Sequence, residues 1–125
     1  MKRIDTYFLL LATIMLLFGV LVGMYMAMNK DFQLVPVHAH ANLVGWVSLA
    51  LFGLTYRAYP ELKLSRLARV HFALSAAAAI LMPYAIYRAA ILQSDGLAIV
   101  TSTTWLLAVL IFLAQLVRLV RTDTD

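Results

Sequence analysis

The sequence predicts an all-α membrane protein with four transmembrane helices. Of its 125 residues, 64% are hydrophobic and only 13% are charged. A soluble domain of this size needs a larger polar surface to cover its core. Four apolar stretches each reach the ~20 residues required to cross ~30 Å of hydrocarbon. The charged connections between them are short, so residues 1–125 are expected to form a single four-helix domain.

The four expected spans follow one another closely. They cover about residues 6–28, 37–56, 70–92 and 97–117. Only helices and closed barrels satisfy the backbone in lipid, and these uninterrupted runs are too long for strands. The first apolar run is longer than the core of a usual signal peptide, so we expect it to be retained as a span.

The charges predict the orientation of the chain. The formal net charge is +4, but the basic residues form short clusters beside the apolar runs. This pattern is typical of membrane anchors and gives no indication of nucleic-acid binding. Two basic residues, Lys30 and Arg88, are expected on one side of the membrane. The other eight are expected on the opposite side: Lys2, Arg3, Arg57, Lys63, Arg66, Arg69, Arg118 and Arg121. Because basic residues favour the cytoplasm, both termini and the connection at 59–69 are predicted to be cytoplasmic, in a multi-pass protein of the inner (cytoplasmic) membrane.

The second span carries two histidines near the outer face. Pro36 can start a helix because its missing N–H would be unpaired there, which places His38 and His40 in the first turns. Two positions along a helix correspond to ~200°, so the imidazoles point to opposite sides. They are not expected to chelate one ion together, but each could serve a different site. The side that His40 shares is apolar and suits a flat porphyrin or lipid: Val44, Val47, Leu51 and Leu54.

These histidines are open to three interpretations. Ionisable groups inside a span are costly and usually have a partner or a task, and neutral imidazole is a common ligand of metals, including haem iron. Copper is the alternative metal, with the thioethers of Met24, Met26 and Met28 as further soft ligands. The third interpretation is a non-catalytic accessory subunit whose histidines are structural. The chain has no cysteine, which excludes disulfides, thiolate sites and cysteine nucleophiles.

The same stretch resembles a ligand-bearing helix of the haem–copper oxidase catalytic subunits, including the nitric oxide reductases. HANLV at 40–44 resembles their motif around a low-spin haem ligand, and FGLTY at 52–56 resembles the end of that helix. HAH at 38–40 resembles a His-x-His pair that serves adjacent haems. The resemblance implies a single four-helix arc of a twelve-helix fold. It further implies a homotrimer in which haem b is held between chains by His38 and His40, with a dimer as the alternative.

The chain also departs from that family. It has no adjacent histidine pair for a copper site, and Glu61 is its only glutamate. The sequence therefore gives no support to oxygen or nitric oxide reduction by the family's binuclear mechanism. It favours an electron-transfer protein whose redox partner is unknown, and it leaves open whether the chain is an enzyme.

Two further residues are candidates for a role at or near the haem. Arg88 follows His71 by 17 residues, about 25 Å along a helix, which places it at the depth of His38 and His40. Its guanidinium could bind haem propionates or reach the lipid headgroups. His71, on the cytoplasmic side, is expected to pack or lie at the interface, or to act as a separate ligand or proton carrier.

Overall fold

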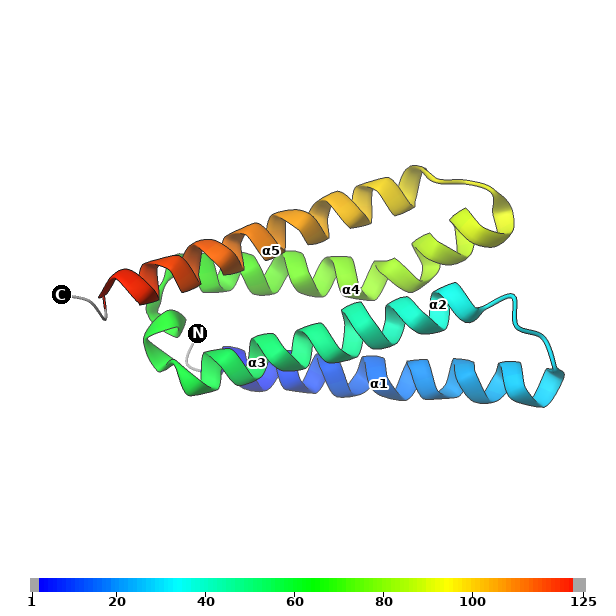
Figure 1. The fold of residues 1–125 in the computed structure, drawn as a ribbon, viewed down its shortest axis with the longest axis horizontal. Coiled ribbons are helices and arrows are strands. Elements are labelled where there is room, and N and C mark those ends of the chain that lie inside the picture. The colour runs from blue at the N-terminus through cyan, green and yellow to red at the C-terminus, as the bar shows by residue number, and fades with distance from the viewer. Residues whose placement is uncertain (1–2, 123–125) are drawn as a thin grey trace.

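The computed structural model describes residues 3–122 and folds them into antiparallel helical rods (Figure 1). Four of its helical stretches are long and apolar enough to cross a membrane, which confirms the predicted all-α class and four helices of spanning length. The helices run further than the predicted spans, because backbone hydrogen bonding continues beyond the apolar residues. The elements are α1 (Ile4–Asn29), α2 (Val35–His40), η1 (Ala41–Ser48), α3 (Leu49–Ala58), η2 (Pro60–Leu64), α4 (Arg66–Leu92) and α5 (Gly96–Thr122).

The two ends of the bundle differ in charge. The start of α1, the connection η2 and the end of α5 lie at one end, called here the η2 end (Figure 1). The α1–α2 and α4–α5 connections lie at the other, called the loop end. Seven of the eight residues predicted to share one side belong to elements at the η2 end, while Lys2 lies outside the described residues. The side of the membrane that each end faces stays a prediction.

Short-range chemistry sets the helix boundaries. Tyr59 leaves the helical conformation before Pro60, because a proline disfavours that conformation in the residue before it. The Ser65 hydroxyl then caps α4 by accepting the Leu67 N–H at 3.1 Å. At the loop end, α1 and α4 each finish at a left-handed residue, Lys30 with φ 53° and Gln93 with φ 52°. The sequence therefore encodes both helical hairpins locally.

The elements α2, η1 and α3 follow one another as one helical stretch, called here the second rod. It contains a π-helical segment that was not predicted from the sequence. Residues 41–48 form η1, directly after the two histidines of α2. The Ser48 hydroxyl donates to the Leu43 carbonyl at 2.8 Å within this segment. A regular helix was therefore the wrong expectation for η1, although it holds for α2. α1 and η1 also pack closely in this segment: a Cβ on Gly45 would lie 2.8 Å from Met15 Cβ, which leaves no room for a larger residue.

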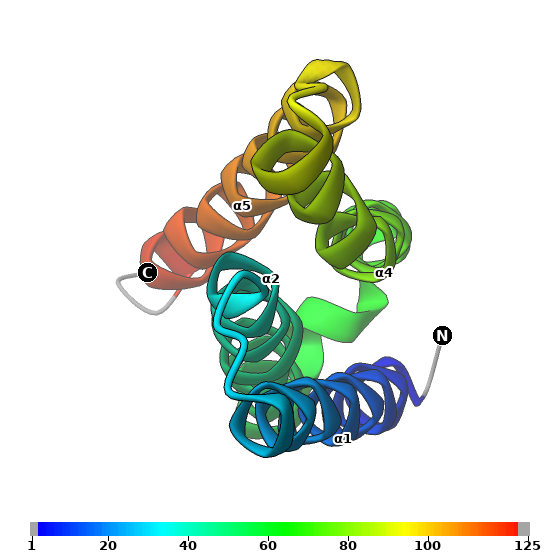
Figure 2. The ribbon, with the colours of Figure 1, turned by 90° about the vertical axis from the view of Figure 1, so that its right-hand side faces the viewer.

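The buried core lies toward the η2 end, and an apolar groove opens beyond it. Phe8, Phe52 and Tyr56 form the centre of the core. Further along α4, Pro83 lacks an N–H for the helix ladder, and the ends of α4 and α1 diverge toward the loop end (Figure 2). The resulting groove, of about 810 Å³, is lined by α1, α2 and α4, including Phe18, Val37 and Tyr84.

Candidate functional site

His38 belongs to α2, and its ring packs against α1. Its Nδ1 is 2.8 Å from the carbonyl oxygen of Gly19 in α1. Two glycines make this contact feasible, because a Cβ on Gly23 would lie 3.0 Å from the His38 ring and a Cβ on Gly19 would collide with the Asn42 side chain. The small residues of α1 therefore form a seat for the first histidine.

Asn42 supports that seat one turn later. Its Nδ2 donates to the His38 carbonyl at 2.9 Å. The same nitrogen is 3.5 Å from His38 Nδ1, too long for a strong hydrogen bond. The Gly19 carbonyl can only accept, so its shorter contact determines that His38 Nδ1 carries the proton. The lone pair of the ring is then on Nε2.

His40 has the same protonation pattern on a different surface. Its Nδ1 is 2.8 Å from the Pro36 carbonyl of its own helix, so Nδ1 again donates and Nε2 keeps the lone pair. The apolar strip predicted on this side is outward-facing in part, with Val47, Leu51 and Leu54 exposed. His38 therefore faces a neighbouring helix of its own chain, whereas His40 is half-buried beside an exposed apolar strip.

This arrangement suits metal binding by separate imidazoles. A ligand histidine commonly donates its second ring N–H to a carbonyl, which fixes the tautomer and the orientation of the ring. Both rings meet that condition here. Within residues 3–122, no group of three or more His, Asp or Glu side chains is placed to hold a metal ion. The three methionines of the copper alternative also differ in placement, since Met26 is buried while Met24 and Met28 are exposed.

Arg88 lies at the loop end but has a partner in its own chain. Its Nη2 donates to the Ser94 hydroxyl at 2.9 Å. This bond ties the end of α4 to the connection that leads into α5. The apolar groove lies beside these residues without including His38, His40 or Arg88 among its lining side chains. The described residues thus place the predicted ligands at one end of the bundle, outside the lining of this groove.

His71 lies at the opposite end, in the core. Its ring is fully buried and stacks on Phe112 with centroids 5.2 Å apart. The Tyr56 hydroxyl is 3.0 Å from His71 Nδ1, and Gln115 Nε2 donates to that hydroxyl at 2.8 Å. Neither Tyr56 nor Gln115 was predicted to contact this histidine. A polar glutamine within the apolar run of the fourth span was the available signal.

A buried carboxylate was also missed. Asp5, at the start of α1, pairs with Lys63 at 3.0 Å and with Arg57 at 3.3 Å. An acidic residue beside an apolar run, with basic residues near the second connection, was the only sequence signal. The pairs join α1 to α3 and η2.

Comparison with models of known families, with curated proteins and with solved structures finds no match for this chain. The resemblance to one arc of a haem–copper oxidase therefore stays a prediction. Any functional conclusion depends on the side chains at the two ends of the bundle.

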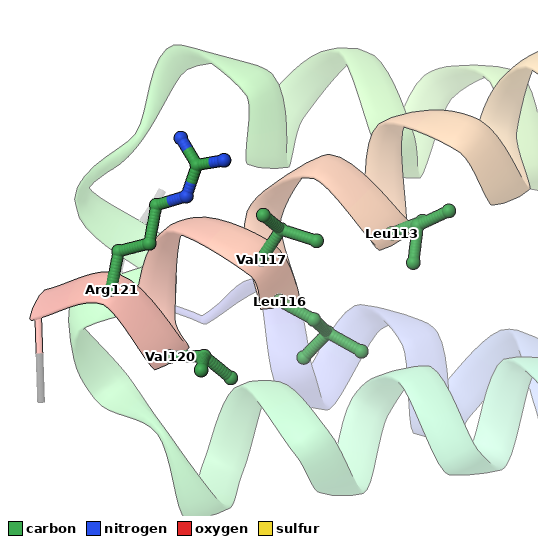
Figure 3. Close-up of a pocket in the computed structure, with 5 residues that line it drawn as sticks. All are labelled: Leu113, Leu116, Val117, Val120 and Arg121. Carbon is green, nitrogen blue, oxygen red and sulfur yellow. The ribbon is translucent and has the colours of Figure 1, made fainter. Parts of the chain in front are cut away.

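Much of the surface of α5 is exposed and apolar. Only 11% of its most apolar stretch is buried, against 39% for α4. Five side chains of its last turns line a shallow hollow of about 370 Å³, and Figure 3 shows how they lie on α5. They are Leu113, Leu116, Val117, Val120 and Arg121. The hollow is apolar, which is typical of a surface facing hydrocarbon.

Proposed function

We propose that the chain is a haem-binding electron-transfer protein of the membrane, in which His38 of one chain and His40 of the next bind each iron. The proposal rests on the hydrogen-bonding pattern that the two histidine rings have in common. Each donates Nδ1–H to a backbone carbonyl at 2.8 Å, so each presents the Nε2 lone pair that iron binds.

The division between two chains follows from the surfaces that the rings face. His38 is seated against α1, while His40 lies beside an exposed apolar strip. A single regular helix cannot direct both rings to one iron, because they diverge by ~200°. Adjacent chains in a closed ring would satisfy each histidine once. We propose a trimer with one haem per chain, a number that rests on the resemblance to one of three arcs.

A bound haem would supply one-electron chemistry, and His38 and His40 are the residues that would hold its iron. The residues of this chain would hold the macrocycle and exclude water. Arg88 is the basic side chain in α4 nearest the loop end and would bind the propionates, after exchanging its bond with Ser94.

An absorption spectrum of the purified protein in detergent tests the proposal, with haem quantified per chain. We expect a Soret band and sharp bands on reduction. His38→Ala and His40→Ala should each lower haem per chain at least tenfold. His71→Ala, at the opposite end of the bundle, is the control and should keep full occupancy per folded chain. Full haem occupancy in either single variant at the loop end would refute the ligand assignment.

Mixing the two variants tests the shared site. In a trimer that contains both His38→Ala and His40→Ala chains, an interface that joins the remaining His38 to the remaining His40 is intact. Co-expression should therefore recover part of the haem, and native mass spectrometry should show a trimer. A haem-loaded monomer, or mixed trimers without haem, would contradict the arrangement. A dimer with one haem would replace it with a symmetric pair.

A further inference from the structure

A row of hydrogen-bonded polar side chains, Gln115, Tyr56 and His71, enters the bundle from the η2 end. It begins at a pocket of about 200 Å³ whose lining includes Glu61, Ser65, Arg118 and Gln115. Gln115 is buried, so its amide forms the inner wall of this pocket. Behind it lie Tyr56 and His71, both fully buried. A surface pocket and an internal histidine are thus separated by one amide and one hydroxyl.

The hydrogen bonds along this row of side chains can point in either of two directions. In one, Gln115 Nε2 donates to the Tyr56 oxygen at 2.8 Å, and Tyr56 donates to His71 Nδ1 at 3.0 Å. His71 Nε2 then carries the ring proton. In the other, Tyr56 donates to Gln115 Oε1, at 3.2 Å, and His71 Nδ1 donates to Tyr56. The two arrangements differ only in the position of protons, as the members of a proton relay must.

At the inner end of this row of side chains, two buried polar atoms of the described residues have no hydrogen-bond partner. Among the described residues, His71 Nε2 and Ser75 Oγ are buried side-chain atoms without a hydrogen bond. Residues four apart on a helix lie on the same face, so His71 and Ser75 share one face of α4. Buried polar atoms nearly always bind protein groups or ordered water. Two unpartnered polar atoms on one helix face therefore suit an internal water.

The other surroundings of His71 are aromatic. Phe8 from α1, Phe52 from α3 and Phe112 from α5 surround the ring, with centroids 4.6–5.2 Å away. Tyr56 is the titratable side chain that contacts it among the described residues. The nearby carboxylate of Asp5 is paired with Lys63 and Arg57. The Gln115–Tyr56 side is therefore the polar approach to the ring.

We propose that His71 and Ser75 hold an internal water and that Tyr56 and His71 relay protons between this water and the η2-end pocket. When the Gln115 amide turns aside, a hydronium in the pocket gives a proton to the Tyr56 oxygen. The original Tyr56 proton moves to His71 Nδ1, and the Nε2 proton leaves for the internal water. One proton enters and one leaves. Ser75 lies about 14 Å along α4 from Arg66, so the path reaches roughly the middle of the ~30 Å hydrocarbon layer.

Solid-state NMR of the full chain in bilayers, with ¹⁵N-labelled histidine, tests this site without any haem. Its failure is therefore distinct from failure of the proposed function. His71→Phe assigns the His71 ring signals by their disappearance. We expect magnetisation transfer from water to the His71 ring, and Ser75→Ala should weaken it. After transfer to D₂O, Tyr56→Phe should slow deuteration of the ring at least tenfold.

Two further variants keep the test decisive. Gln115→Met retains side-chain length and should also alter the exchange rate, which covers the case in which Tyr56→Phe does not fold. Thr104→Val is the control, because this exposed hydroxyl of α5 bonds to its own helix at the Val100 carbonyl. Its exchange rate should match that of the unmodified chain. Absence of water transfer to His71, or an exchange rate unaffected by the Tyr56 and Gln115 variants, would overturn the proposal.

Discussion

At the scale of single residues, the Asp5 carboxylate is held by two cations of different exposure. The side chains of Asp5 and Lys63 are 7% and 16% exposed, and their charged atoms are 3.0 Å apart. Arg57 is 62% exposed and 3.3 Å away. Exposed ion pairs contribute little to stability, whereas removing one partner from a buried pair leaves an uncompensated charge. The two cations are therefore expected to contribute unequally.

Substitution of each cation by an uncharged side chain of similar length tests this difference. We expect Lys63→Met to lower the free energy of unfolding by about 1–2 kcal/mol. Arg57→Met should lower it by less than about 0.5 kcal/mol. Unfolding followed by circular dichroism in one detergent measures both variants under matched conditions. Equal losses would show that exposure does not govern the contribution of these pairs.

The glycines of α1 give a residue-scale prediction for the histidine seat. A methyl group at Gly23 would lie 3.0 Å from His38 Cε1, so Gly23→Ala should displace the ring from the Gly19 carbonyl. We expect haem per chain to fall several-fold. Gly96→Ala is the matched control, since a Cβ there meets no atom within 4 Å. Unchanged occupancy and spectrum in Gly23→Ala would show that His38 does not depend on this seat.

At the scale of elements, the π-helical segment lies between the two histidines and the core-packing part of the same helical stretch. It lies between α2, which carries the rings, and α3, whose buried face includes Leu49, Phe52 and Tyr56. A π turn contains more residues than an α turn. Removing one residue from η1 should restore α geometry and rotate His38 and His40 by about 100° relative to α3.

Deletion of Leu43, an exposed residue of η1, tests this role. The deletion variant should remain helical but lose most of its haem, because the rotated rings leave the Gly19 seat and the outward strip. Leu43→Ala keeps the residue count and should retain haem. Circular dichroism and the Soret absorbance measure the two effects separately. Full haem binding after the deletion would mean that the π geometry has no bearing on the site.

The elements that could be predicted from the sequence are those encoded by neighbouring residues. Long apolar runs determine the spans, and breakers such as Pro60 determine the connections. The opposed directions of His38 and His40 also follow from helical spacing alone. The π segment could not be predicted, because the apolar run at 41–48 has the same pattern as the regular helices and contains no breaker. The Tyr56–His71–Gln115 contacts could not be predicted either, since they join residues 15 and 59 positions apart.

At the scale of the whole molecule, the basic η2 end is predicted to face the cytoplasm. The chain has no cysteine, so single cysteines can be introduced without background. Leu64 in the η2 connection is 87% exposed, and Asp95 in the α4–α5 connection is also exposed. In intact cells, Leu64→Cys should resist an impermeant thiol reagent, while Asp95→Cys should react. The opposite pattern of labelling would reverse the orientation and place His38 and His40 on the cytoplasmic side.

The position of the outermost helix ends has a consequence for how copies can be joined. The first residue of α1 and the last turn of α5 lie at the same end of the bundle (Figure 1). Two copies could therefore be linked covalently, head to tail, by a short hydrophilic connector that never crosses the bilayer. Each added copy would keep its orientation, because it contributes an even number of crossings. Gene duplication could thus convert an assembly of separate subunits into one longer polypeptide, after which each copy would be free to acquire different ligands.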